Sequence, residues 1–389
     1  MIGLVTLYKE NYGSILQAFA ISHFIKSLGQ QCVIIQEIPS QGMFAKTIRR
    51  IPLLVKYLFF SSFRYFFHLQ DNVVTVDYKN PAEKSLKKMK SFISNNFFIK
   101  NIPICKLKNL SERKYDFFIT GSDQVWKTIF SVDPIRFLQF APREKRIALA
   151  ASFGISEIPK YNQKALRKAL NGFDYISVRE ETGVEIVKKY SNTKVCRIAD
   201  PTFIYDADEW RKFAKEAVIP SQKYILVHFL NEPNEIALGS MAWLSEQLNL
   251  DVVALGYKYD NFNNLKRFTY MDGGPWEYVS MIDHAEFVLT DSFHSSLFSI
   301  NFNKHFFVFH RNYSVSKQTS RISDLLKRFG MDERLVENVD TLKTVYLKGL
   351  PAETRLVLGK ERATIRDYIQ KSISGQIPQC FLQGDNNGL

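Results

Sequence analysis

Three polar segments in this chain of 389 residues each follow a run of apolar, β-type residues. They are KENYGSILQ (9–17), TGSDQVW (120–126) and TDSFHSS (290–296). Open α/β sheets bind ligands at the carboxyl ends of their parallel strands, where these segments are expected to lie. Gly13 and the exposed backbone amides around it offer an anion site at a helix N-terminus, and His294 stands near the start of another helix. The segments therefore predict a ligand site with a place for an anion.

Common catalytic and metal-binding motifs are absent from the sequence. It contains no Walker A, HExxH, GxSxG or GxGxxG motif. The 7 histidines show no HxxxH or HxH spacing, and the 4 cysteines lie far apart without a CxxC pair (Cys32, Cys105, Cys196 and Cys380). We therefore predict no metal and no cofactor, and reduced, mostly buried thiols rather than a disulfide or a zinc site.

The charge of the chain is strongly positive. There are 52 Lys and Arg against 39 Asp and Glu, which gives +13. Such a surface attracts nucleic acid, acidic lipid, or phosphorylated and carboxylated metabolites. No apolar run reaches the roughly 18 residues that a membrane-spanning helix needs, and the N-terminus has neither the basic region nor the cleavage site of a secretory signal. We expect a cytoplasmic protein that is not integral to a membrane.

Short β-type runs alternate with helical segments, which is typical of a parallel sheet covered by helices. The predicted strands are 2–6, 32–36, 116–120, 146–151, 174–179, 194–198, 224–230, 251–256, 287–292 and 305–309. An amphipathic helix is predicted over residues 14–28, ended by a left-handed Gly29. Because the pattern restarts after residues 200–210, we predict two doubly wound Rossmann-type domains, 1–205 and 206–389, facing a central cleft. The helical segment 352–373 is expected to pack back across their junction.

Residues 38–70 break this rhythm because they contain no acidic residue. Aromatic side chains there surround five basic ones, namely Lys46, Arg49, Arg50, Lys56 and Arg64. This combination is typical of contact with an anionic membrane surface or with a lipid-linked acceptor. A buried helical hairpin whose basic side chains reach water is equally compatible with the sequence.

Seven segments in fixed order resemble the polysaccharide pyruvyl transferase family. They are NYGSILQAFA (11–20), TGSDQVW (120–126), ASFG (151–154), SVREETGVEIVKKY (177–190), DPTFIYDADEW (200–210), TDSFHSSLFS (290–299) and SRISDLLKRFG (320–330). The resemblance covers about residues 1–330. It implies an α/β fold of the two-domain GT-B type. It also implies transfer of the enolpyruvyl group of phosphoenolpyruvate to a sugar, usually as a cyclic ketal on a capsule or other envelope glycan.

The resemblance implies roles for single residues as well. Arg179 matches an arginine that binds phosphoenolpyruvate, and His294 matches the histidine of the catalytic site. Many relatives have Arg-Leu-His where this chain has Ser292-Phe293-His294. Arg311 and Arg321 are our candidates for a cation that substitutes for this arginine in anchoring the donor.

The residue types suit this chemistry. Guanidinium groups and helix N-termini bind phosphate and carboxylate, and an imidazole serves as acid or base near neutral pH. Asp123 is our candidate for the base that orients the acceptor hydroxyl. The remaining predicted substrate-binding residues are Asn11, Tyr12, Gly13, Gln17, Ser122 and Ser292.

Each of these assignments has a structural alternative. His294 also suits the capping region of a helix, Arg179 an ion pair with a neighbouring glutamate, and Asp123 the cap of a turn. Asp200, which precedes Pro201, is compatible with a hinge or with a ligand contact. Three of the predicted residues are compatible with the turn and core instead, namely Asn11, Tyr12 and Gln17.

Two other functions remain open for the whole chain. A GT-B glycosyltransferase that uses a nucleotide sugar would share the fold and the acceptor, but it would release a nucleoside diphosphate instead of phosphate. A nucleic-acid-binding protein is suggested only by the positive charge, and no known DNA- or RNA-binding module is present. We favour a phosphoenolpyruvate donor, a lipid-linked oligosaccharide acceptor at the inner membrane face, and no nucleic acid.

Overall fold

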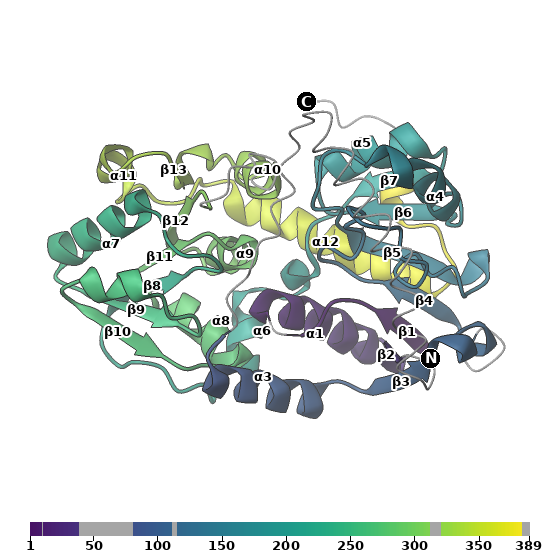
Figure 1. Cartoon of the computed structure of the whole chain (residues 1–389), viewed down its shortest axis with the longest axis horizontal. Helices are drawn as coiled ribbons and strands as arrows, with labels where there is room; N and C mark the ends of the chain where they lie inside the picture. The colour runs from purple at the N-terminus through teal and green to yellow at the C-terminus, as the bar shows by residue number, and fades with distance from the viewer. Residues whose placement is uncertain (10, 39–80, 111–114, 312–319, 383–389) are drawn as a thin grey trace, which may run out of the picture.

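The chain forms two halves, each built around one parallel β-sheet (Figure 1). The computed structural model describes residues 1–9, 11–38, 81–110, 115–311 and 320–382. Of the basic, aromatic-rich segment 38–70, only Ile38 belongs to these residues, so the predictions for that segment lie outside the described structure.

The first sheet has seven parallel strands in the order β3-β2-β1-β4-β5-β6-β7. They are β1 (Ile2–Val5), β2 (Cys32–Ile38), β3 (Ile99–Pro103), β4 (Phe117–Thr120), β5 (Arg146–Ala151), β6 (Tyr175–Val178) and β7 (Lys194–Arg197). The helices of this half are α1 (Tyr12–Ser27), α3 (Glu83–Asn96), α4 (Lys160–Leu170) and α5 (Glu181–Tyr190). All six predicted strands are present. The additional strand β3 lies at the sheet edge and exposes Lys100 and Asn101, so its apolar pattern is weak.

The second sheet has six parallel strands in the order β10-β9-β8-β11-β12-β13. They are β8 (Tyr224–His228), β9 (Asp251–Leu255), β10 (Phe268–Met271), β11 (Phe287–Thr290), β12 (His305–Phe309) and β13 (Leu335–Val336). Its helices are α6 (Ala207–Phe213), α7 (Glu235–Leu248), α8 (Pro275–His284), α9 (Phe293–Asn301), α10 (Ser320–Arg328) and α11 (Val339–Val345). The four predicted strands are present, and the short edge strands β10 and β13 are additional.

The two faces of the first sheet pack into separate hydrophobic cores. Ile34 on one face belongs to the core that contains α1 and continues through the second half. Val33 on the other face belongs to the core under α4 and α5. Because strand side chains alternate between faces, a strand with both faces covered is apolar throughout. This is the doubly wound arrangement that we predicted.

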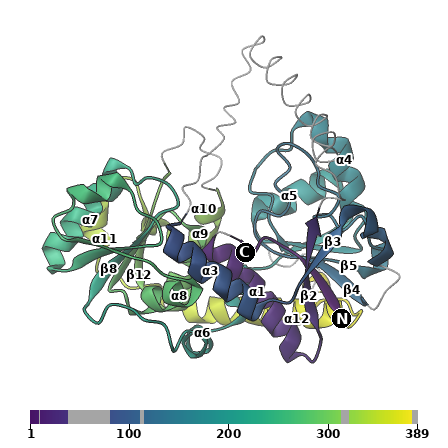
Figure 2. The same ribbon diagram turned by 60° about the horizontal axis from the view of Figure 1, so that its bottom comes forward.

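Helix α1 runs through the centre of the molecule (Figure 2). We predicted it as amphipathic, but it is buried almost all round, from Tyr12 to Ile25, because it packs against elements of both halves. Gly29 follows it with a φ of 78°, as predicted. No helix in the described part of the chain is both long and apolar enough to cross a bilayer.

Helix α12 (Thr354–Ile373) contacts both halves. Arg362 Nη2 donates to Asn301 Oδ1 of α9 at 3.2 Å, and the Tyr368 hydroxyl donates to the Ala148 carbonyl of β5 at 2.7 Å. The chain passes from one sheet to the other between β7 and β8. The proposed domain boundary at residue 205 stays a prediction.

The prediction of unpaired cysteines is wrong for two of the four. Cys196 of β7 forms a disulfide with Cys380, and their Cα atoms lie 6.2 Å apart. The partners are 184 residues apart in sequence, so the spacing of the cysteines along the chain does not indicate that they pair. Helix α12 brings the end of the chain back to the edge of the first sheet. Cys32 is buried and Cys105 is exposed, and both are unpaired.

Candidate functional site

The three predicted polar segments meet where each sheet reverses its strand order. The first sheet reverses between β1 and β4, and the second between β8 and β11. Loops that leave neighbouring strands at such a point diverge and open a crevice. The segments 9–17, 120–126 and 290–296 follow β1, β4 and β11. A cavity between the halves is lined by Arg179 and Asp200 from the first half and by Phe293 and Arg321 from the second.

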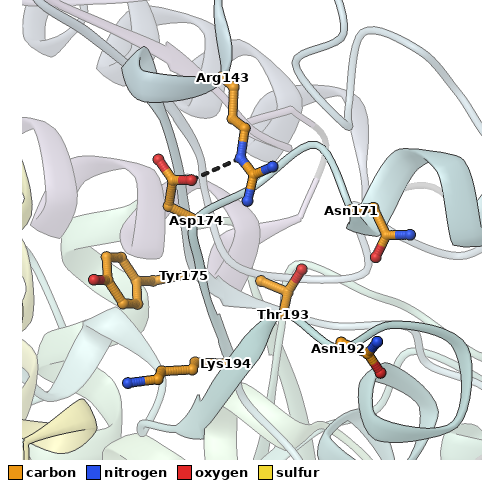
Figure 3. Close-up of a pocket in the computed structure, with 7 residues that line it drawn as sticks. All are labelled: Arg143, Asn171, Asp174, Tyr175, Asn192, Thr193 and Lys194. Atoms are coloured by element: carbon orange, nitrogen blue, oxygen red, sulfur yellow. Dashed lines mark hydrogen bonds and ion pairs between the residues drawn. The ribbon is translucent and has the colours of Figure 1, made fainter.

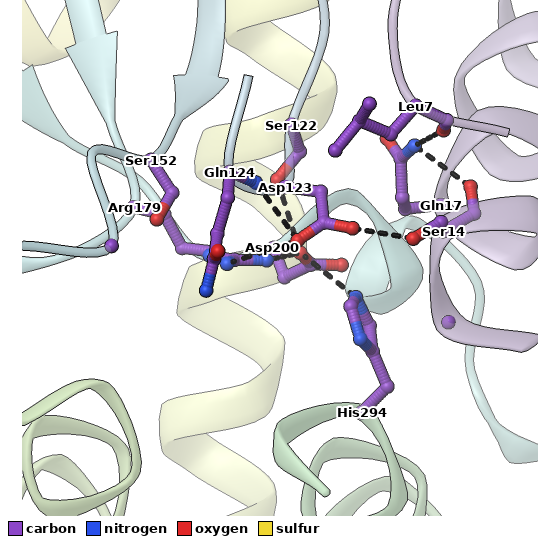
Figure 4. Close-up of polar contacts among 12 residues, drawn as sticks. Leu7, Ser14, Gln17, Ser122, Asp123, Gln124, Ser152, Arg179, Asp200 and His294 are labelled. Carbon is purple, nitrogen blue, oxygen red and sulfur yellow. Dashed lines mark hydrogen bonds and ion pairs between the residues drawn. The ribbon is translucent and has the colours of Figure 1, made fainter. Parts of the chain in front are cut away.

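Asp200 is the centre of the polar network in this region (Figure 4). Its Oδ2 accepts hydrogen bonds from Ser122 Oγ at 3.0 Å and Arg179 Nη1 at 2.7 Å, and it lies 3.6 Å from His294 Nε2. Burial alone would raise the pKa of Asp200, but His294, Arg179 and the Thr202 amide hold it well below its usual value. Asp200 is therefore ionised and positions three of the predicted site residues.

Arg179 is a buried cation with unused donors. Only 6% of the residue is exposed, and its Cζ lies 4.4 Å from the ring centroid of Phe293. Nε and Nη2 have no hydrogen-bond partner among the described residues. Nε lies 3.8 Å from Glu180 Oε2, and Nη2 lies 3.7 Å from Asp123 Oδ1, both beyond hydrogen-bond distance. Because buried donors are almost always paired, these two indicate the place of an absent acceptor.

Asp123 has an uncommon backbone conformation, with a φ of 68°. Its Oδ2 accepts from Ser14 Oγ at 2.5 Å, and its Oδ1 accepts from the Gln124 amide at 2.8 Å and lies 3.7 Å from Arg179 Nη2. Burial would raise the pKa of Asp123, but His294, Arg179 and Ser14 lower it below its usual value. The ionised carboxylate thus has one oxygen facing the cations and the other facing Ser14.

His294 is held at the start of α9 by its neighbours. Ser292 caps that helix by accepting from the Ser295 amide at 3.4 Å. Gly13 packs so closely against the imidazole that a Cβ atom on it would lie 2.1 Å from the ring. His294 Nε2 is buried and has no hydrogen-bond partner in the described residues. The contacts give Ser292 and Gly13 positioning roles, and their roles in substrate binding stay predictions.

At the N-terminus of α1, where we predicted an anion site, a side chain of the chain itself engages two of the backbone amides, and the anion site stays a prediction. Asn11 Oδ1 already accepts from the amides of Gly13 at 2.9 Å and Ser14 at 3.2 Å. Gln17 is fully buried, and its Nε2 donates to Thr6 Oγ1, the Leu7 carbonyl and the Ser14 carbonyl. Asn11 and Gln17 thus fix the first turn of the helix. These contacts are the ones expected if both residues belong to the turn and core, the alternative given for them in the sequence analysis.

Tyr12 connects the two halves. Its ring stacks on Tyr278 with a centroid distance of 4.8 Å and contacts His228 and Tyr257 edge-on. Its hydroxyl donates to the Gly273 carbonyl at 2.7 Å. These residues of the second half enclose a side chain from the first turn of α1, which gives Tyr12 a packing role.

His228 in this aromatic cluster predicts a pH-dependent stability. Burial lowers its pKa to about 4, whereas the unfolded chain keeps the ordinary value of roughly 6.5. Between these values only the unfolded chain binds the proton, so the stabilisation present above pH 6.5 is lost as pH falls toward 4. We expect His228 to account for about 2 kcal/mol of lost unfolding free energy between pH 7 and pH 5. Urea unfolding of the wild type and His228→Phe at both pH values measures this, and an equal pH dependence in the two proteins contradicts it.

Three more cations adjoin Arg179 and Asp123. Both terminal nitrogens of Arg321 donate to the Gln124 amide oxygen, at 2.5 and 2.9 Å, once that amide is turned toward them. Arg311 Nε lies 3.1 Å from Asp291 Oδ2. Burial, and then Arg321 and Arg311, lower the pKa of Lys127. We did not predict Lys127 as a site residue, although it directly follows the segment 120–126.

Unused hydrogen-bond donors converge on this region. They are Arg179 Nε and Nη2, Arg321 Nε and His294 Nε2. Crowding positive charges in a buried site is unfavourable unless an anion accompanies them. The arrangement therefore suits a ligand with more than one anionic group. Within the described ranges, no three His, Cys, Asp or Glu side chains gather where they could hold a metal ion.

Comparisons with solved structures agree with the fold. The S. aureus MnaA–UDP co-structure is similar with a TM-score of 0.53 at 11% identity, over 96% of each chain. UDP-N-acetylglucosamine 2-epimerase from Rickettsia bellii gives a TM-score of 0.48 at 10% identity, also over 96% of each chain. The first likeness confirms the predicted GT-B-like fold.

The sequence comparisons give one family. No curated protein matches the chain significantly. A family model described as polysaccharide pyruvyl transferase matches residues 11–313, which include Asp123, Arg179, Asp200 and His294. The chain therefore belongs to the polysaccharide pyruvyl transferase family.

Proposed function

We propose that this protein transfers the enolpyruvyl group of phosphoenolpyruvate to two hydroxyls of a sugar, which yields a pyruvate ketal and phosphate. The observation that carries the proposal is the set of buried donors on Arg179, Arg321 and His294 that have no hydrogen-bond partner among the residues that the structure describes. Phosphoenolpyruvate has a phosphate and a carboxylate, and both accept paired hydrogen bonds from guanidinium groups. Arg321 is the better substitute for the arginine missing at Ser292, because Asp291 already holds Arg311.

The proposed reaction balances without a further co-reactant. A proton added to the donor methylene makes it a methyl group and leaves an oxocarbenium-like carbon. The first sugar hydroxyl forms a C–O bond to that carbon, the bond to phosphate breaks, and the second hydroxyl closes the ring. The two hydroxyls release two protons, of which one replaces the proton consumed at the methyl group and the other leaves with phosphate.

His294 and Asp123 are the proposed acid and base. Asp200 stays ionised and lies 3.6 Å from His294 Nε2, so it holds the imidazole in place. The lowered pKa of Asp123 makes it a weak base in the empty site. A bound donor adds negative charge beside Arg179 and Arg321, which raises the pKa of Asp123 toward the value that a base needs.

Replacing Arg179 with lysine tests donor binding. Arg179→Lys keeps the positive charge but loses the planar fork, so phosphoenolpyruvate should bind about tenfold more weakly or worse. Isothermal titration with phosphoenolpyruvate measures the affinity, and thermal unfolding checks the fold. Arg143→Lys is the matched control, because Arg143 is exposed and pairs with Asp174. Equal donor affinity in wild type and Arg179→Lys would remove Arg179 from the donor site.

The acceptor is proposed to be a lipid-linked glycan of surface polysaccharide assembly. The basic, aromatic sequence of residues 38–70 supports this class of acceptor. A purified lipid-linked glycan fraction incubated with phosphoenolpyruvate and the protein should gain the mass of one pyruvate ketal and release phosphate. Transfer from a nucleotide sugar with release of nucleoside diphosphate would instead support the glycosyltransferase alternative.

A further inference from the structure

A second cavity, of about 170 Å³, adjoins the site at Asp123. It is lined by the residues that end β1 and follow it (5–9), by the end of β2 (35–37), and by Ser14, Ile135 and Arg136. Strand β1 borders the point where the first sheet reverses its order, so the cavity lies where such sheets bind ligands. Ser14 joins the two sites, because it lines the cavity and its hydroxyl donates to Asp123 Oδ2 at 2.5 Å.

Asp123 thus stands between two different environments. Its Oδ1 faces the Arg179 guanidinium, where the proposed donor anion binds, and its Oδ2 accepts from Ser14, which lines the second cavity. A base that activates an acceptor hydroxyl must lie between donor and acceptor. This geometry makes the second cavity the natural place for the acceptor.

The lining of the cavity suits a sugar. Tyr8 offers an aromatic ring, and its hydroxyl donates to Gln36 Oε1 at 2.7 Å. The Gln36 amide and the Thr6 and Ser14 hydroxyls add polar groups. Binding sites of this kind combine an apolar surface with a few placed polar groups. The volume matches one sugar ring better than a long chain.

The charges of the lining select among sugars. Lys9 and Arg136 are cations, and Glu37 is an acid that already has an interaction partner. The Arg136 guanidinium is partly buried, and no hydrogen bond or ion pair involves it among the described residues. Lys9 Nζ lies 5.2 Å from the Tyr8 ring centroid, and the charge of Arg136 acts on the Tyr8 hydroxyl by lowering its pKa against the effect of burial. A cation without a counter-ion at a binding cavity favours an anionic ligand.

We propose that this cavity is the acceptor subsite and that Arg136 and Lys9 recognise an anionic group on the acceptor sugar, a phosphate or a carboxylate. The proposal rests on the proposed function. The reacting hydroxyl donates to Ser14 Oγ while Ser14 donates to Asp123 Oδ2, so its proton passes to Asp123 as its oxygen bonds to the donor carbon. That proton later leaves with phosphate.

The steady-state kinetics of Arg136→Gln test this subsite with the lipid-linked glycan fraction as acceptor. We expect the KM for the glycan to rise about tenfold, because a charged hydrogen bond is lost, while the KM for phosphoenolpyruvate stays within twofold. Arg136→Lys should restore part of the glycan affinity. Lys9→Gln, which changes an exposed side chain, should raise the glycan KM without affecting folding.

Arg143→Gln is the control. Arg143 lines a separate hollow at the amino ends of β6 and β7 with Asp174 and Lys194 (Figure 3), so its loss should leave both KM values unchanged. An unchanged glycan KM in Arg136→Gln, or an equal rise in the phosphoenolpyruvate KM, overturns the proposal. If the wild type releases no phosphate from phosphoenolpyruvate with the glycan, the proposed function fails and the subsite with it.

Two treatments of the glycan distinguish the sources of the anionic group. One removes its phosphate by mild acid, and the other reduces its carboxylates to alcohols. The treatment after which Arg136→Gln and wild type have equal glycan KM values identifies the group that Arg136 binds. If the difference persists after both treatments, the anionic group is not what Arg136 recognises and the proposal is overturned.

Discussion

His294→Ala is expected to lower turnover by about 10²–10⁴-fold, the usual contribution of a general acid or base. The imidazole lies 3.6 Å from the ionised Asp200, and its Nε2 has no hydrogen-bond partner in the described part of the chain. Of the side chains in α9 (Phe293–Asn301), His294 alone is titratable. Its removal therefore leaves this helix without a group that can move the proton. Phosphate release from phosphoenolpyruvate in the presence of glycan measures the loss.

The donor should still bind to His294→Ala, because Arg179 and Arg321 keep their guanidinium groups. Phosphoenolpyruvate affinity should fall far less than turnover in this variant. His310→Ala is the matched control. His310 is partly exposed, its Nε2 lies 2.8 Å from Glu337 Oε1, and neither residue belongs to the Asp200 network. If His294→Ala keeps more than half of the wild-type turnover, the histidine has only a structural role and the role implied by the family fails at this position.

The fold could be predicted from the sequence because both sheets are parallel and covered by helices. Their buried strands are continuous apolar runs, such as residues 224–230. Such runs can be recognised in a single sequence, without an alignment of relatives. The three strands that we missed lie at sheet edges, where fewer side chains are buried. The disulfide between Cys196 and Cys380 depends on where α12 ends in space, and the local sequence pattern does not determine that position.

The site was predictable to the level of segments but not of individual contacts. Residues at the ends of β4 and β11 were identified from the strand pattern, and Arg179 at the end of β6 from the resemblance to the family; the network joins Asp123, Arg179 and His294 through their contacts with one another and with Asp200. The central role of Asp200 was not apparent, because a single Asp before Pro also suits a hinge. The use of Asn11 as a cap for Gly13 depends on side-chain geometry that the sequence leaves open.

Gly13→Ala is expected to lower turnover by about 10²-fold, although helix propensity alone would make it stabilising by up to about 1 kcal/mol. An added Cβ would lie 2.1 Å from His294 Cγ and Nδ1 and 2.6 Å from His294 Cβ. Rotation of the ring cannot relieve the contact with His294 Cβ, because that atom is fixed to the backbone of α9. Helices α1 and α9 must therefore separate, which moves the imidazole away from Asp200. A stability loss of about 1–3 kcal/mol should accompany the change, as for other overpacked sites.

Gly359→Ala provides the control for Gly13→Ala, because Gly359 lies within α12 and no atom would come within 4 Å of its Cβ. That variant should gain up to about 1 kcal/mol and keep full turnover. Urea unfolding and steady-state kinetics on both variants separate the contact with His294 from the general effect of replacing a helical glycine. Opposite signs of the two stability changes are expected. If Gly13→Ala instead resembles Gly359→Ala in both measurements, close packing of α1 on α9 does not position His294, and the catalytic role of the histidine must then be explained by Asp200 alone.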